Sequence, residues 1–145
     1  MPLNSEQVYY EDVHEGEEIP ALRKACTSQQ LVMWAGASGD FYQIHYDPDF
    51  ARGTGLDGII VQGGLKNAFL GQLLHDWIAP AGFLRRFGCQ YRGMDYPNQE
   101  ILCRGVVTRK YEEAGQALID LEIWTENAAG KKTTPGTATV ILPRR

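Results

Sequence analysis

The stretch from Gly64 to about Ile78 constrains the fold of this chain more than any other segment. Apolar residues recur in it at four-residue steps, which predicts one long helix. The two apolar rows are Leu65, Phe69, Leu73 and Trp77, and beside them Leu70, Leu74 and Ile78. More than half of the helix circumference is therefore apolar, so we expect a sheet to wrap around this helix. Pro80 and Gly82 end it.

The remaining segments read mainly as strands, because apolar and polar residues alternate along them. We predict strands at 22–26, 87–91, 101–110, 119–123 and 140–142, with a helix from Thr27 or Ser28 to about Ala37 and a short helical piece at 49–52. The connections after the long helix are short and rich in turn residues, which favours an antiparallel meander. We therefore predict an α+β fold, in which an antiparallel β-sheet wraps around a long central helix. Residues 1–145 are expected to form one domain.

Charge and cysteine content exclude several classes of protein. The formal net charge is −4 and the basic residues are scattered, so nothing favours a nucleic-acid partner. Cys26, Cys89 and Cys103 are odd in number and widely spaced, which indicates free thiols in a reducing compartment and no zinc site. Residues 1–20 lack the apolar region of a secretory signal, and polar residues interrupt 56–78. We expect a cytoplasmic protein with no membrane segment.

The loop from Gly39 to Pro48 carries the first candidate site. Asp40 and His45 lie five residues apart in it. A water held between a carboxylate and a neutral imidazole can lose a proton to one group while the other returns one. From the residues alone an ordinary structural role remains open, in which Asp40 caps the next turn and His45 is a partly buried histidine.

Two glycines, Gly63 and Gly64, precede the long helix and form the second candidate site. Free backbone N–H groups point outward at a helix start, and the helix dipole there favours negative charge. A thioester carbonyl that rests on such a donor would have its developing enolate charge stabilised. The glycines also fit a plain tight turn, so this signal alone leaves both interpretations open.

Taken together, the two segments resemble the MaoC-like, (R)-specific enoyl-CoA hydratase family of hotdog-fold proteins. The resemblance runs from about Gly16 to Pro143. It comprises the Asp-x4-His loop with its trailing Asp-Pro, the Ile-Val-x-Gly segment and the helix that follows. The spacing from His45 to Gly63 matches the family without a gap.

The resemblance implies a hydro-lyase that adds water reversibly, in syn geometry, to a trans-2-enoyl thioester of CoA or acyl-carrier protein, as in fatty acid metabolism. Asp40 and His45 would be the catalytic pair on one water, and the Gly63 N–H would bind the thioester oxygen. Gly64, Gln62 and Tyr42 would line the substrate site. No metal or other cofactor is implied. Hotdog proteins pair their sheets edge to edge, so we expect a homodimer or a heteromer with a related hotdog subunit.

The chain departs from the family pattern at three places. Tyr42-Gln43 replaces the usual Asn-Pro, Gln62-Gly63-Gly64 replaces His-Gly-Met, and Gly71 replaces a small hydroxyl residue. These changes would reshape the pocket for a bulky acyl group. The alternatives are a hotdog thioesterase, for which Asp76 is the sole carboxylate on the helix, and a non-catalytic acyl-thioester-binding subunit.

Overall fold

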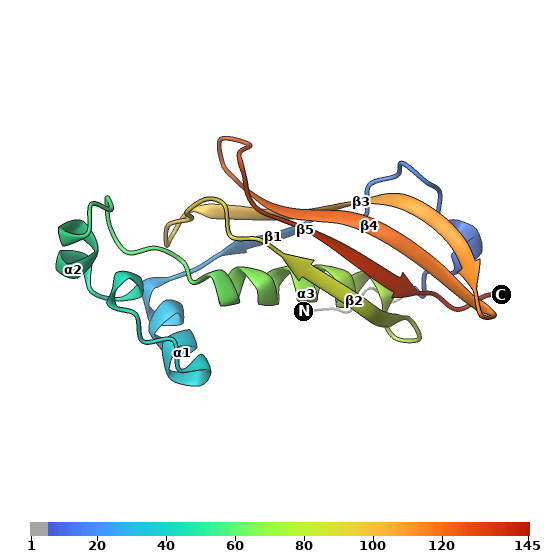
Figure 1. Ribbon diagram of the computed structural model, residues 1–145, viewed down its shortest axis with the longest axis horizontal. Coiled ribbons are helices and arrows are strands. Elements are labelled where there is room, and N and C mark those ends of the chain that lie inside the picture. Colours follow the sequence, from blue (N-terminus) through green and yellow to red (C-terminus); the bar gives the residue numbers. More distant parts are fainter. Residues whose placement is uncertain (1–5) are drawn as a thin grey trace.

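A computed structural model describes residues 6–145 as a five-stranded sheet that curls over one long helix (Figure 1). The strands are β1 (Leu22–Ala25), β2 (Phe83–Cys89), β3 (Glu100–Glu113), β4 (Gln116–Asn127) and β5 (Lys132–Ile141). The α-helices are α1 (Ser28–Ser38), α2 (Pro48–Gly53) and α3 (Gly63–Ile78), and the 3-10 turns are η1 (Tyr10–Asp12) and η2 (Gln43–His45). The predicted α+β class, with an antiparallel sheet around a central helix, is confirmed.

The strand order corrects the predicted meander. All pairs are antiparallel and the order is β1-β3-β4-β5-β2, so only β3 to β5 form a meander. β2 pairs with β5 at the far edge, and the connection over 90–99 leads the chain back across to β3. That connection is bound to the segment before α3, where the Val61 N–H donates to the Asp95 carbonyl at 2.8 Å. Tyr91, expected in a strand, lies in this connection.

The core forms where α3 meets the concave face of the sheet. All seven apolar residues predicted to face inward are buried: Leu65, Phe69, Leu70, Leu73, Leu74, Trp77 and Ile78. They pack against inward-facing side chains of β3, β4 and β5, including Val107, Ile119, Leu121, Ile123 and Val140. Each such side chain contributes roughly 1.5–3 kcal/mol through its removal from water. α1 and α2 lie together at the end of the sheet where α3 begins (Figure 1).

The free thiols lie mostly in the interior. Cys26 and Cys103 are buried and Cys89 is half-buried. Burial raises the pKa of the Cys103 thiol to about 12, so this thiol stays protonated at neutral pH. Within residues 6–145, none of the helices combines the length and hydropathy that crossing a bilayer requires.

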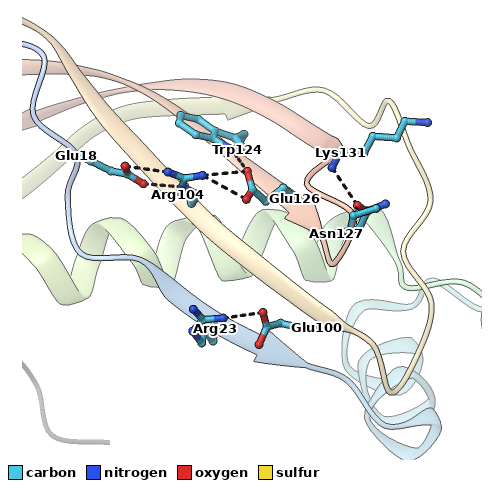
Figure 2. A network of polar contacts seen from close by, with 9 residues as sticks. Glu18, Arg23, Glu100, Arg104, Trp124, Glu126, Asn127 and Lys131 are labelled. Atoms are coloured by element: carbon cyan, nitrogen blue, oxygen red, sulfur yellow. Dashed lines mark hydrogen bonds and ion pairs between the residues drawn. The ribbon is translucent and has the colours of Figure 1, made fainter.

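Arg104, on the outer face of β3, connects the N-terminal segment to the sheet (Figure 2). Its guanidinium donates to Glu18 Oε2 at 2.8 Å and to Glu126 Oε1 at 3.3 Å. It also lies over the ring of its cross-strand partner Trp124, 5.5 Å from the centroid. The Trp124 indole N–H donates to Glu126 at 2.8 Å, which completes the cluster.

Arg104→Met is expected to destabilise the protein in a pH-dependent way. The hydrogen bond from Arg104 lowers the pKa of Glu18 below its ordinary value. A carboxyl group whose pKa is lowered by folding stabilises the protein above its ordinary pKa, and loses that effect as the pH falls through the lowered value. Urea unfolding over a pH series should therefore show the loss at neutral pH and a smaller one in acid. Arg23→Met, which breaks the exposed Arg23–Glu100 pair (Figure 2), is the control. An equal loss at every pH would contradict the assignment.

Candidate active site

The loop that carries Asp40 is fixed at both ends by helix caps. α1 ends at Gly39, whose left-handed backbone (φ 77°) lets its N–H bond the Ala35 carbonyl at 2.9 Å. At the other end the Asp47 side chain caps α2 and accepts from the N–H groups of Asp49 and Phe50 at 3.1 and 3.0 Å. An N-cap such as Asp47 typically contributes about 1 kcal/mol. The intervening loop therefore has little freedom.

Within this loop the Asp40 and His45 side chains approach each other. Asp40 Oδ2 lies 3.7 Å from His45 Nε2, which is too far for a direct hydrogen bond but close enough for one water to contact both atoms. The His45 side chain is 8% exposed, whereas that of Asp40 is 44% exposed. The carboxylate therefore reaches the buried imidazole from the solvent side.

The hydrogen bond made by the other ring nitrogen of His45, Nδ1, determines which nitrogen carries the proton. Nδ1 lies 2.8 Å from the Ile60 carbonyl oxygen. A carbonyl can only accept, so Nδ1 donates, and in the neutral ring Nε2 is left without a proton. The free lone pair of Nε2 is the one that faces Asp40.

Gly63, the first residue of α3, offers a free backbone N–H at the start of this helix. Gln62 occupies the N-cap position and makes no side-chain capping bond, and among residues 6–145 no acceptor engages the Gly63 N–H. A Cβ atom at Gly63 would lie 2.9 Å from ring atoms of Tyr91. The Tyr91 ring therefore packs directly on the Gly63 backbone, and only glycine fits this position without a shift of the ring.

His45 and Gly63 line one pocket of about 280 Å³, together with Lys66, Tyr91 and residues 60–61 and 92–94. His45 and the first residue of α3 thus line one cavity. A larger hollow of about 660 Å³ is lined by residues of β2, β3, β4 and β5, but its described lining carries no imidazole and only one carboxylate, Glu122. The smaller pocket is lined by His45, which Asp40 approaches to 3.7 Å, and by the start of α3, so it is the candidate active site.

The other residues expected at the site divide into two groups. Tyr42 is 54% exposed, and its ring meets His45 edge-on at 6.2 Å between centroids. Gln62 is fully buried and donates to the Leu31 carbonyl at 2.7 Å, while no described residue bonds its Oε1. A Cβ at Gly64 would lie 3.4 Å from the Trp34 indole. Tyr42 thus lies beside the pair, whereas Gln62 and Gly64 join α1 to the start of α3.

Sequence reasoning missed the buried ion pair of Lys66 and Asp95. Both side chains are 2% exposed, and Lys66 Nζ lies 3.0 Å from Asp95 Oδ2. A signal for Lys66 was present in the sequence. The apolar row Leu70, Leu74 and Ile78, continued back by one four-residue step, arrives at Lys66, so a charge there had to be buried. Asp95 has no comparable signal, because it lies in an irregular connection.

Comparisons of the sequence with known proteins identify one protein family. A sequence model of the MaoC like domain family matches residues 12–133. An (R)-specific enoyl-CoA hydratase from Rhodospirillum rubrum is 26% identical over 142 residues, which cover 94% of this chain and 93% of that protein.

Two solved structures show the same fold. The unliganded R-hydratase PhaJ1 from Pseudomonas aeruginosa superposes with a TM-score of 0.85 at 18% identity, over 96% of this chain and 88% of that one. A chain of the ChsH1–ChsH2 complex from Mycobacterium tuberculosis superposes with a TM-score of 0.77 at 22% identity, over 89% and 98%. These likenesses establish the arrangement of strands and helices.

Proposed function

Because the chain belongs to the MaoC-like domain family, with the hotdog fold of its neighbours, we propose that it is a hydro-lyase acting on 2-enoyl thioesters. The reaction is reversible addition of water to a trans-2-enoyl thioester of CoA or an acyl-carrier protein, giving the 3-hydroxyacyl thioester. One observation carries the proposal: His45 Nε2 lies 3.7 Å from Asp40 Oδ2. His45 also lines the same pocket as the start of α3, which has no side-chain cap.

The proposed mechanism uses one water and two proton carriers. The water bridges Asp40 Oδ2 and His45 Nε2, one of which takes its proton as the oxygen bonds to C3 of the enoyl group. The electron pair of the double bond shifts toward the thioester oxygen, where the Gly63 N–H stabilises the negative charge. A proton from the pair then bonds to C2. Both hydrogen and hydroxyl arrive from the same side, so the addition is syn.

The position of Asp76 argues against the thioesterase alternative. Asp76 lies thirteen residues after Gly63 on α3, which at 1.5 Å per residue is roughly 20 Å along the helix axis. Its carboxylate accepts from Gln72 at 3.4 Å. A thioester whose carbonyl rests at Gly63 is therefore out of reach of this carboxylate.

Incubation with crotonyl-CoA and longer enoyl-CoA esters is expected to give the (R)-3-hydroxyacyl product without release of free thiol. Loss of absorbance from the conjugated thioester measures hydration, a thiol reagent measures hydrolysis, and chiral chromatography identifies the product. Thiol release at the rate of absorbance loss would establish a thioesterase. An (S) product would contradict the family's reaction, and absence of any turnover would favour a non-catalytic binding subunit.

The free edges of the sheet are the proposed contact between two chains. β1 and β2 each have one side without a strand partner in the described part of the chain, and β2 is the longer. An unpaired edge carries open backbone donors and acceptors that need protection. We expect β2 edges from two chains to pair, either in a homodimer or with a related hotdog subunit.

Light scattering on the purified chain should therefore give the mass of a dimer. A dimeric mass together with activity of the chain alone on ordinary enoyl-CoA esters would establish the homodimer and exclude a required second subunit. A stable, active monomer would refute the assembly proposal.

A further inference from the structure

A single peptide unit connects His45 to the buried ion pair. The carbonyl of this unit belongs to Ile60 and accepts from His45 Nδ1 at 2.8 Å. Its N–H belongs to Val61 and donates to the Asp95 carbonyl, also at 2.8 Å. A peptide unit is planar and conjugated, so a bond made at its N–H orients the carbonyl and increases the negative charge on its oxygen.

The ion pair fixes Asp95, and hence this peptide unit, in place. Asp95 Oδ2 accepts from Lys66 Nζ at 3.0 Å and from the Thr133 hydroxyl at 2.6 Å. Lys66 also donates to the Gly93 carbonyl at 3.0 Å, and the Gly93 N–H donates to the Thr133 carbonyl at 2.9 Å. The contacts join α3, the connection over 90–99 and β5 at one point behind His45.

A contribution to folding stability does not by itself explain why Lys66 and Asp95 form a buried ion pair. Removing two charges from water costs several kcal/mol per ion, and a buried pair often does no better than apolar residues of the same size. The cost here is incompletely offset, because Asp95 Oδ1 is buried and has no partner among residues 6–145.

Two oxygens compete for the one proton of the neutral imidazole. Ile60 O lies 2.8 Å from Nδ1, and Asp40 Oδ2 lies 3.7 Å from Nε2. If the Ile60 carbonyl moved away, a proton on Nε2 could bond Asp40 directly. That bond would take both the lone pair of Nε2 and the space for the water between the two groups.

We propose that Lys66 and Asp95 are positioning residues for His45: they hold the Ile60–Val61 peptide so that the imidazole keeps its proton on Nδ1. Nε2 then stays free to exchange protons with the bridging water. The role given to Nε2 rests on the proposed hydratase function, whereas the location of the ring proton does not.

Other charged groups near His45 do not explain the proton on Nδ1. Asp40 attracts it to the opposite nitrogen, and Arg92, which lines the pocket, donates to Gln90. On α2, Asp49 and Arg52 are exposed and pair with each other at 3.5 Å. α1 contributes no charged residue, because Ser28–Ser38 contains none.

The double variant Lys66→Met/Asp95→Asn tests the proposal. Met and Asn match the replaced side chains in size, and Asn still accepts from Thr133, so both charges are removed without leaving one unpaired. Nitrogen NMR of the His45 ring is expected to show Nδ1–H in the native chain and a population shifted toward Nε2–H in the variant. The turnover number should fall about ten- to a hundredfold, by analogy with the hydrogen-bond partners that orient metal-binding histidines, with KM nearly unchanged.

Thr125→Val is the matched control. It removes a buried hydroxyl at the far end of the same network, where Thr125 Oγ1 lies 2.9 Å from Thr133 Oγ1. It should lower stability and leave the ring proton and turnover as they are. A folded double variant with native turnover and Nδ1–H overturns the proposal, and so does a control that shifts the ring proton equally.

A second substitution keeps every side chain in case the double variant does not fold. Replacing Val61 by its α-hydroxy acid turns the Ile60–Val61 amide into an ester. The ester lacks the N–H that bonds Asp95 and has a weaker carbonyl acceptor, so the ring proton should again shift toward Nε2. An unchanged ring proton overturns the proposal. If the native chain hydrates no enoyl thioester, the hydratase function fails, and the NMR comparison still decides this inference.

Discussion

Asp40→Asn and His45→Gln are each expected to lower turnover about a hundred- to ten-thousand-fold, the usual contribution of a positioned acid or base. Both should leave the fold intact. Asn keeps an oxygen for the Tyr42 N–H, which lies 3.4 Å from Asp40 Oδ1. Gln keeps an N–H donor for the Ile60 carbonyl. Steady-state kinetics on an enoyl-CoA ester, with circular dichroism for the fold, measure the effect.

The double variant separates a shared role from two independent ones. If both groups act on one water, as proposed, their joint removal costs less than the product of the single losses. Asp49→Asn and His14→Gln are matched controls, since both residues are exposed and carry the same chemical groups. Near-normal turnover in the double variant would eliminate this site.

Gly63→Pro is expected to lower turnover about a hundred- to a thousandfold, because one oxyanion donor is commonly worth about 3–4 kcal/mol in the transition state. Proline deletes the N–H at position 63, which is the first residue of α3. Proline is well tolerated at this helix position, so the helix itself should form. The loss should appear mainly in the turnover number, since the charge it stabilises develops only in the transition state.

Because the Tyr91 ring packs on Gly63, the Gly63→Pro experiment needs a control for steric effects. Any Cβ at Gly63 meets ring atoms at 2.9 Å, so part of the effect of proline is steric. Gly63→Ala adds the same Cβ and keeps the N–H. Comparing alanine with proline in a Tyr91→Ala background isolates the donor. If proline and alanine turned over equally there, the thioester oxygen would have to bind elsewhere.

Local patterns in the sequence predicted the long helix and most strands, because periodicity and turn residues report on nearby contacts. α3 begins one residue before the predicted start, and its apolar rows face the core as expected. The partner of β2 was not predictable in this way. Its pairing with β5 depends on a long-range route of the chain over 90–99, for which the sequence has no local signal.

The residues of the candidate site also fall into those with a local sequence pattern and those that only the fold brings together. Asp40, His45 and Gly63 belong to two segments whose spacing carries a recognisable pattern, and their catalytic roles stay predictions until the variants are measured. Lys66 and Asp95 come from a helix and a distant connection, so only the three-dimensional structure brings them together. Tyr91 was expected in a strand, and its place over Gly63 follows from the early end of β2 at Cys89.

The crossing from β2 to β3 has a consequence for how the protein acquires its pocket. Residues near positions 45, 63 and 93 must all meet before the pocket exists, and they come from segments far apart in the chain. Contacts of large sequence separation form slowly, because the chain loses loop entropy before they stabilise it. A folding intermediate in which α3 has formed but β2 has not reached β5 therefore lacks this pocket. Recovery of activity after dilution from denaturant should follow closure of the sheet rather than formation of the helix.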